Sequence, residues 1–354
     1  MLDEINLLKG LVSVYSPSQQ EEGAVHFLVS QMKDAGFQTE IDAAGNAIGF
    51  RGSGSHEIML LGHIDTVPGE IPVRIDGDLL FGRGTVDAKG PLACFTAAAS
   101  RLNPPAGWKI TVIGAVGEES ASHGAYHLRD TRDRPEALVI GEPSRWDRIT
   151  LGFKGSLTIG YTYQQPSAHS AGKNGTASEE AIRFWNEVVA WCSQINQDSS
   201  TNYSMLSPTL HSIHSYTDGF KDSVKMRIQF RLPPSIQPQD ISTRLDELKG
   251  EAVLTHDEGI PAYKADKNNP LVRAFLPAIR QHGGIPNFST KSGTSDMNIV
   301  APLWQCPVIA YGPGDSSLDH TPNEHISLTE YLKSIDVLSA ALSQFWSQAS
   351  TATP

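Results

Sequence analysis

The stretch EIMLLGHIDTVP, residues 57–68, combines a buried strand with polar side chains at its end. Its apolar run Ile58–Leu61 has the length and composition of a strand covered on both faces. His63 and Asp65 follow directly, and residues two apart on a strand face the same way. Because ligands of α/β proteins bind at the carboxyl ends of strands, this pattern indicates a candidate site. For these two residues alone, a polar turn remains the alternative.

Strand and helix patterns alternate on either side of this stretch. Apolar runs at 109–116 (KITVIGAV) and 137–140 (ALVI) are typical of buried strands, and residues 89–102 are alanine-rich and helical. Strands that alternate with helices predict an α/β layer with a mostly parallel sheet. We therefore expect the first part of the chain to form an α/β domain.

The pattern changes near residue 152. Residues 153–163 (FKGSLTIGYTY) alternate apolar and polar side chains, as a sheet with one solvated face does. The β-α-β-β-α-β order that follows is typical of a small two-layer α+β, ferredoxin-like domain. We expect one α/β domain built from residues 1–151 and 261–354, interrupted by a smaller inserted domain at 152–260.

The charge, apolar runs and cysteine pattern of the chain exclude several kinds of partner and location. The chain has 354 residues and a formal net charge of −11, which argues against nucleic acid or an anionic membrane as its main partner. No run of 18 apolar residues occurs, so we expect no transmembrane helix. Three distant cysteines without metal-binding spacing predict free thiols in a reducing cytoplasm. The acidic N-terminus has the pattern of a first helix rather than of a targeting sequence.

Three further motifs carry carboxylates where a strand ends or a helix begins. Asp87 lies in GRGTVDAKGPL, the adjacent Glu118 and Glu119 end VIGAVGEES, and Glu142 lies in GEPS after the ALVI run. Taken singly, each motif has an ordinary explanation. Asp87 fits a helix N-cap, the Glu118–Glu119 pair fits a solvated loop, and Glu142 fits a turn or helix cap. Two adjacent carboxylates at the end of an apolar strand nevertheless repel each other unless a positive charge lies nearby.

The spacing of these motifs indicates one shared site. His63, Asp87, Glu119 and Glu142 are separated by 23 to 32 residues, about one βα unit each, which places them along one edge of the sheet. His320, in LDHTPNEHI, follows another predicted strand, CPVIAY. Two histidines and three carboxylates are the ligand count for two divalent cations that share a carboxylate. Oxygen and imidazole ligands without thiolate suit Zn²⁺, with Co²⁺ or Mn²⁺ as substitutes.

The motifs HxD, RGxxDxKG, GEE and GEP, in this order, resemble the M20 family of zinc metallopeptidases and deacylases over nearly the whole chain. The resemblance implies a zinc-peptidase-like catalytic domain interrupted by a lid and dimerisation domain. It also implies that Asp87 bridges two metal ions, that Asp65 orients His63 and that Glu118 is the general base. Relatives carry a cis peptide bond after the bridging aspartate. The implied metal ligands are His63, Asp87, Glu119, Glu142 and His320.

The inserted domain and the following segment add residues that the resemblance assigns to substrate. His169, in PSAHSAG, matches the lid histidine that reaches the partner subunit's site and polarises the scissile carbonyl. Arg231, in FRLPP, lies where relatives bind a substrate carboxylate. The stretch KSGTSDMN resembles the branch of hydrolases that release lysine or ornithine from an amino-group carrier protein. It contributes Lys291, Gly293 and Thr294 as candidate substrate-binding residues.

The resemblance implies a dinuclear amide hydrolase that acts on a small N-acyl amino acid or on a γ-glutamyl conjugate of an acidic carrier protein. It also implies a cytoplasmic homodimer or higher oligomer. Another M20 deacylase, such as an acetylornithine deacetylase or a succinyl-diaminopimelate desuccinylase, and a dipeptidase are the alternatives. A metal-binding scaffold without catalysis would lack Glu118 or a ligand, and all six positions are intact. Because the chain is itself acidic, a patch that docks an acidic carrier has to be local.

Overall fold

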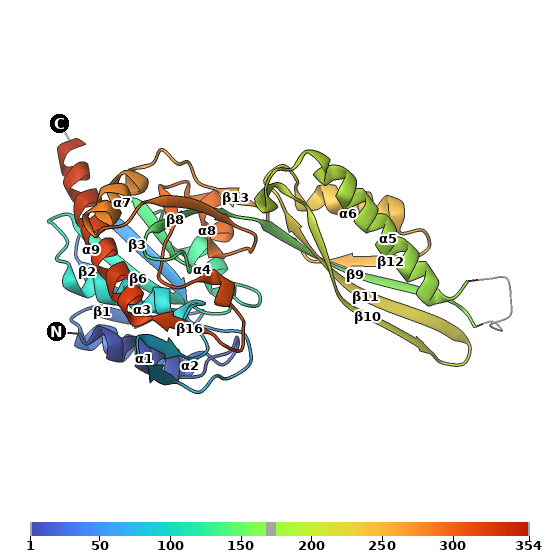
Figure 1. Ribbon diagram of the computed structural model, residues 1–354, viewed down its shortest axis with the longest axis horizontal. Coiled ribbons are helices and arrows are strands. Elements are labelled where there is room, and N and C mark those ends of the chain that lie inside the picture. Colours follow the sequence, from blue (N-terminus) through green and yellow to red (C-terminus); the bar gives the residue numbers. More distant parts are fainter. Residues whose placement is uncertain (1, 168–174, 353–354) are drawn as a thin grey trace. The chain divides into compact units, whose positions relative to one another are not determined.

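The computed structural model describes residues 2–167 and 175–352 (Figure 1). The chain divides into two compact units. The first comprises Met1–Gly152, Ala265–Ser289 and Ile299–Pro354, and the second comprises Phe153–Lys264 and Thr290–Asn298.

A mixed sheet forms the centre of the first unit, with its strands in the order β1-β2-β6-β3-β7-β15-β8. The pairs β6–β3, β3–β7 and β7–β15 are parallel, whereas β1–β2, β2–β6 and β15–β8 are antiparallel. The expected α/β class is confirmed, and parallel pairing occupies the middle of the sheet. The strands are β1 (Gln38–Ile41), β2 (Ala47–Gly52), β3 (His56–His63), β6 (Trp108–Ala115), β7 (Ala137–Gly141), β8 (Arg148–Phe153) and β15 (Val308–Ala310).

Helix α3 (Lys89–Arg101) is the central helix of this unit, because it is buried from Lys89 to Ala99 and packs against β3, α1 and α9. Its alanines keep the helix narrow enough for close approach on several sides, and Asp87 lies just before its first turn. The other helices with residues in this unit are α1 (Glu4–Ser13), α2 (Glu22–Asp34), α4 (His123–Thr131), α7 (Pro270–Gln281), α8 (Asp296–Trp304), α9 (Leu328–Ala352) and the short η3 (Ser316–Leu318).

A small second sheet in the first unit joins distant parts of the chain. Its order is β16-β5-β4, from β4 (Arg74–Asp76), β5 (Leu79–Phe81) and β16 (His325–Ser327). The antiparallel register of β16 and β5 pairs His325 with Phe81. The segment that precedes Asp87 is thereby held beside the segment that follows His320.

The second unit is a four-stranded antiparallel sheet in the order β10-β11-β9-β12, with α5 and α6 on one face (Figure 1). Leu157, Ile159 and Tyr161 alternate inward from β9, and Tyr161 stacks on Phe184 of α5 at 4.6 Å between ring centroids. This is the expected two-layer α+β arrangement. Its elements are β9 (Gly155–Pro166), α5 (Ala177–Ile195), η1 (Asn196–Asp198), η2 (Asn202–Ser204), β10 (Ser207–Thr217), β11 (Lys221–Leu232), α6 (Pro238–Leu248), β12 (Val253–His256), β13 (Tyr263–Lys264) and part of β14 (Asn287–Lys291).

Among the described residues, no helix has the length and apolar character needed to cross a membrane.

Candidate active site

Strand register brings the polar motifs of the first unit to one edge of its sheet. In the parallel pairs of β3, His63 lies opposite Ala115 of β6, and Gly62 lies opposite Gly141 of β7. The Glu118–Glu119 pair begins three residues after Ala115, and Glu142 directly follows Gly141. Because these three strands run in the same direction, their carboxyl ends meet at the same edge.

Asp87 lies at the centre of a cluster of imidazoles and carboxylates. Its Oδ1 lies 3.1 Å from His63 Nε2, and its Oδ2 lies 3.0 Å from His320 Nε2. His320 Nε2 also lies 2.9 Å from Glu119 Oε1. Asp87 therefore presents one oxygen to each of two imidazoles, which is the disposition expected of a carboxylate shared between two cations.

Opposite charges hold this cluster together. Burial lowers the pKa of His63, but its interactions with Asp65 and Asp87 outweigh burial, and the pKa lies well above 6.5. Hydrogen bonds to Asp87 and Glu119 raise the pKa of His320 to about 10. Burial alone would raise the pKa of Asp87, yet both imidazoles together hold it well below its usual range. The two imidazoles therefore lie where they can place positive charge beside Asp87 and Glu119.

The residues present fit a divalent cation. Ligand atoms of His63, Asp87 and Glu119 lie within 4.8 Å of one another, and they form the one such group in the described part of the chain. The donors are imidazole nitrogen and carboxylate oxygen, whereas the three cysteines are buried free thiols. This donor set suits borderline or hard divalent cations.

Asp65 supports both His63 and the Glu118–Glu119 loop. Its carbonyl oxygen lies 3.0 Å from His63 Nδ1, and its Oδ1 lies 3.5 Å from the same nitrogen. Because a carbonyl oxygen can only accept, His63 carries a proton on Nδ1 and directs Nε2 at Asp87. The buried carboxylate of Asp65 accepts hydrogen bonds from the peptide N–H groups of Glu118 and Glu119, both at 3.1 Å.

Glu118 and Glu142 are the remaining predicted residues of this unit. The Asp87–Ala88 peptide bond is cis, as the family resemblance implied. Gly90 allows the Asp87 loop to close on α3, because an added Cβ would lie 2.2 Å from Thr85 O. Glu118 is half-buried and contributes to the raised pKa of His63. Glu142 is half-buried at the end of β7.

Residues 59–344 match the model of peptidase family M20/M25/M40. The chain belongs to this family. It is therefore a metal-dependent amide hydrolase. The M20 chain is 40% identical to the LysW-lysine hydrolase of Deinococcus radiodurans, with 96% of each chain covered. It is 31% identical to the LysW-lysine/LysW-ornithine hydrolase of Sulfurisphaera tokodaii, with 94% of each chain covered.

Known structures agree on the M20 fold. A tripeptidase from Staphylococcus aureus superposes with a TM-score of 0.80 at 18% identity, over 98% of this chain and 100% of the other. A dinuclear metal-binding M20 peptidase from Bacillus subtilis superposes with a TM-score of 0.70 at 11% identity, over 96% and 97%. At such low identity, these likenesses show the fold alone.

The second unit of this M20 chain gathers several of the predicted substrate residues. Arg231 Nη1 donates to Thr294 Oγ1 at 3.0 Å, and Thr294 Oγ1 donates to the carbonyl oxygen of Lys154 at 2.8 Å. The Lys154 N–H donates to the carbonyl oxygen of Lys291 at 3.2 Å. Gly293 is exposed in the same loop. His169 lies outside the described residues.

Lys154 was not among the predicted site residues, because the alternating run FKGSLTIGYTY does not show that this lysine is buried. Its side chain is 1% exposed, and Nζ donates to Asn202 O and Ser207 Oγ, both at 3.1 Å. Burial, followed by repulsion from Arg231, lowers its pKa to about 8. The segment around Arg231 therefore contains a second basic side chain, that of the buried Lys154.

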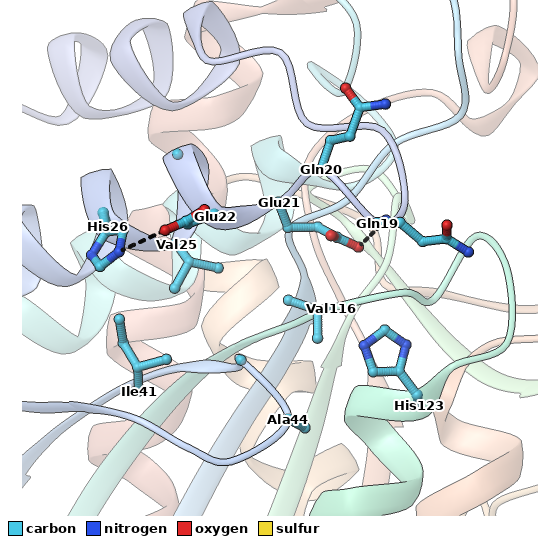
Figure 2. Close-up of a pocket in the computed structure, with 12 residues that line it drawn as sticks. Gln19, Gln20, Glu21, Glu22, Val25, His26, Ile41, Ala44, Val116 and His123 are labelled. Atoms are coloured by element: carbon cyan, nitrogen blue, oxygen red, sulfur yellow. Dashed lines mark hydrogen bonds and ion pairs between the residues drawn. The ribbon is translucent and has the colours of Figure 1, made fainter.

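A separate hollow of about 800 Å³ lies beside the start of α2 in the first unit (Figure 2). Figure 2 shows Glu21 facing the backbone of Gln19, and His26 facing Glu22. None of the five predicted metal ligands lines this hollow. It therefore adds nothing to the cluster around Asp87.

Proposed function

We propose that this M20 hydrolase releases lysine or ornithine from an amide on the amino acid's α-amino group, with a carrier-linked γ-glutamyl conjugate as the principal substrate. The supporting observation is its 40% identity, over 96% of both chains, to a LysW-lysine hydrolase. An N-acyl amino acid is the smaller substrate of the same chemical class. Another M20 deacylase or a dipeptidase is the alternative, because the metal ligands alone do not distinguish among these reactions.

We assign two divalent cations to the cluster around Asp87, with Zn²⁺ as the first candidate and Co²⁺ as the alternative. His63, Asp87 and Glu142 would hold one, whereas Asp87, Glu119 and His320 would hold the other. When bound, such cations lower the pKa of a water molecule and polarise the scissile carbonyl.

Glu118 would act as the general base and then as the general acid. It would remove a proton from the attacking water and return it to the departing amine. Its support is its place beside the proposed ligand Glu119, on a loop whose N–H groups are held by Asp65. His169 would polarise the carbonyl from the partner subunit, as the family resemblance implies.

Recognition of the substrate would come from the second unit. Arg231 can bind the α-carboxylate of the released amino acid through two parallel hydrogen bonds. Lys291 would attract the free carboxylate of a carrier's terminal glutamate, and Gly293 and Thr294 would form the adjoining loop. The contacts of Arg231 with Thr294, and of Thr294 with Lys154, support a fixed position for the guanidinium group.

A homodimer through the second unit would complete the site. Strand β10 lies at the end of its sheet and leaves Ile213 and Tyr216 41% and 49% exposed. Pairing two such edges across a two-fold axis removes an edge that otherwise invites aggregation. Mixing His169→Ala with Glu118→Gln subunits should restore about one competent site per mixed dimer. Verified subunit exchange without rescue would contradict a shared site.

A hydrolysis panel tests the proposed substrate. It compares N-acetyl-lysine, N-acetyl-ornithine, N-succinyl-diaminopimelate and a carrier peptide that ends in γ-glutamyl-lysine. We expect the carrier conjugate to give the highest kcat/KM, and the N-acetyl compounds to be hydrolysed more slowly. Efficient desuccinylation without activity on lysine or ornithine conjugates would overturn the proposal. Three buried free thiols favour the reducing cytoplasm as the location of this reaction.

A further inference from the structure

Glu324 is a completely buried carboxylate, 0% exposed, that the reaction chemistry above does not use. Its Oε1 accepts hydrogen bonds from the peptide N–H groups of Val86 at 2.9 Å and Asp87 at 3.2 Å. Its Oε2 pairs with Arg83 Nη1 at 2.8 Å. A buried charge is stable only when such partners replace water. One of these partners is the peptide N–H group of Asp87, the residue at the centre of the candidate metal cluster.

Arg83 extends this connection to the other ligand loop. Its Nη1 also donates to Thr321 O at 3.2 Å, and its Nε donates to Gly69 O at 3.0 Å. Thr321 directly follows His320, whose φ of +61° is a left-handed conformation that a non-glycine residue adopts only when its surroundings hold it. The Arg83–Glu324 pair therefore contacts the backbone on both sides of the cluster.

We propose that Glu324 is a positioning residue for the metal centre: with Arg83, it fixes the Asp87 loop and the His320 loop at their working separation. The pairing of β5 with β16 brings these loops together, and the buried ion pair sets the position of the ligand-bearing backbone. This inference rests on the proposed ligand roles of Asp87 and His320. Outer groups that orient metal ligands affect metal affinity and activity by about 10–100-fold.

Glu324→Gln isolates the charge. The amide oxygen can still accept from the N–H groups of Val86 and Asp87, but the NH₂ group then faces Arg83, which also donates. Glu57→Gln is the matched control. Glu57 is a buried carboxylate that accepts from Thr111 Oγ1 at 2.5 Å and lies 3.3 Å from Lys109 Nζ. It lies at the start of β3, at the opposite end of that strand from His63.

Co²⁺ added to the metal-depleted chain is the probe. Its affinity and stoichiometry are measured by chelator competition, its visible spectrum reports ligand geometry, and Tm reports stability. For Glu324→Gln, we expect Co²⁺ to bind at least one site about 10–100-fold more weakly, and we expect the visible spectrum of bound Co²⁺ to change. The fold-decrease in kcat should exceed the fold-change in KM. Glu57→Gln should lower Tm while leaving Co²⁺ affinity and the spectrum as in the wild type.

The outcomes separate a positioning role from a merely structural one. Wild-type Co²⁺ affinity, spectrum and kcat in folded Glu324→Gln would overturn the inference. Should that variant not fold, Arg83→Lys decides, because lysine keeps the positive charge but lacks the planar fork that reaches Thr321. Unchanged Co²⁺ affinity in Arg83→Lys would also overturn it. If Asp87→Ala binds Co²⁺ like the wild type, the proposed ligand assignment itself fails.

Discussion

Replacing Asp65 with asparagine should weaken both the fold and the reaction, because each oxygen of its carboxylate accepts a hydrogen bond from a peptide N–H group. Oδ1 accepts from Glu118 N–H, whereas Oδ2 accepts from Glu119 N–H and from Ser18 Oγ at 2.7 Å. The Ser18 hydroxyl can rotate and accept instead, but a peptide N–H cannot. Whichever way the new amide turns, its NH₂ group faces one of the two peptide N–H groups.

The size of the effect follows from one buried donor that loses its acceptor. Such a loss costs about 1–3 kcal/mol. The first unit has about 230 residues, and for a domain of that size each kcal/mol lowers Tm by about 2–4 °C, so we expect Tm to fall by about 2–12 °C. Because the displaced loop carries Glu118 and Glu119, kcat should fall by about 10–100-fold.

Calorimetry and steady-state kinetics on N-acetyl-lysine measure these effects. Asp257→Asn is the control, because this second-unit carboxylate also accepts from two peptide N–H groups, those of Thr158 at 3.1 Å and Gly259 at 3.0 Å. It should leave kcat unchanged. An Asp65→Asn enzyme with wild-type Tm and wild-type kcat would show that the hydrogen-bond argument is wrong.

Three further predictions concern chemistry, metal and substrate. Glu118→Gln should lower kcat by at least about 10²-fold while metal analysis finds both ions retained; near-normal turnover would exclude Glu118 as the base. Chelation should lower Tm by about 5–11 °C for each ion removed, if the metal had been present at 100 times its Kd, and Zn²⁺ should restore it. An unchanged Tm after verified metal loss would contradict this. Lys291→Ala should impair hydrolysis of the γ-glutamyl conjugate more than that of N-acetyl-lysine, whereas Arg231→Ala should impair both. Equal losses in the Lys291 variant would refute its carrier-side role.

The order of the motifs and the strands that carry them were predictable from the sequence alone. The apolar runs that predicted strands at 58–61, 109–116 and 137–140 correspond to β3, β6 and β7. A run of this kind is a local signal, because a strand buried on both faces needs consecutive apolar side chains whatever its neighbours are. The polar residues that end these runs are local signals as well, which is why the candidate ligands could be named in advance.

Strand direction and pairing were decided only by the tertiary structure. The flanking antiparallel pairs make the sheet mixed, and periodicity carries no information about the direction of a neighbouring strand. The pairing of β5 with β16 joins residues 79–81 to residues 325–327. Strands of three residues are too short to show a period, so no pattern in the sequence predicted this contact.

The side chains that support the candidate site were likewise visible only in three dimensions. Glu324 follows His320 in a polar stretch that gives no sign of burial, yet it is 0% exposed beside Arg83. Lys154 is 1% exposed although it lies in an alternating strand pattern. A charged residue becomes buried when distant segments supply its partners. Arg83 and Glu324 are 241 residues apart in the sequence. Their contact depends on how the whole unit packs, so the sequence around either residue does not predict it.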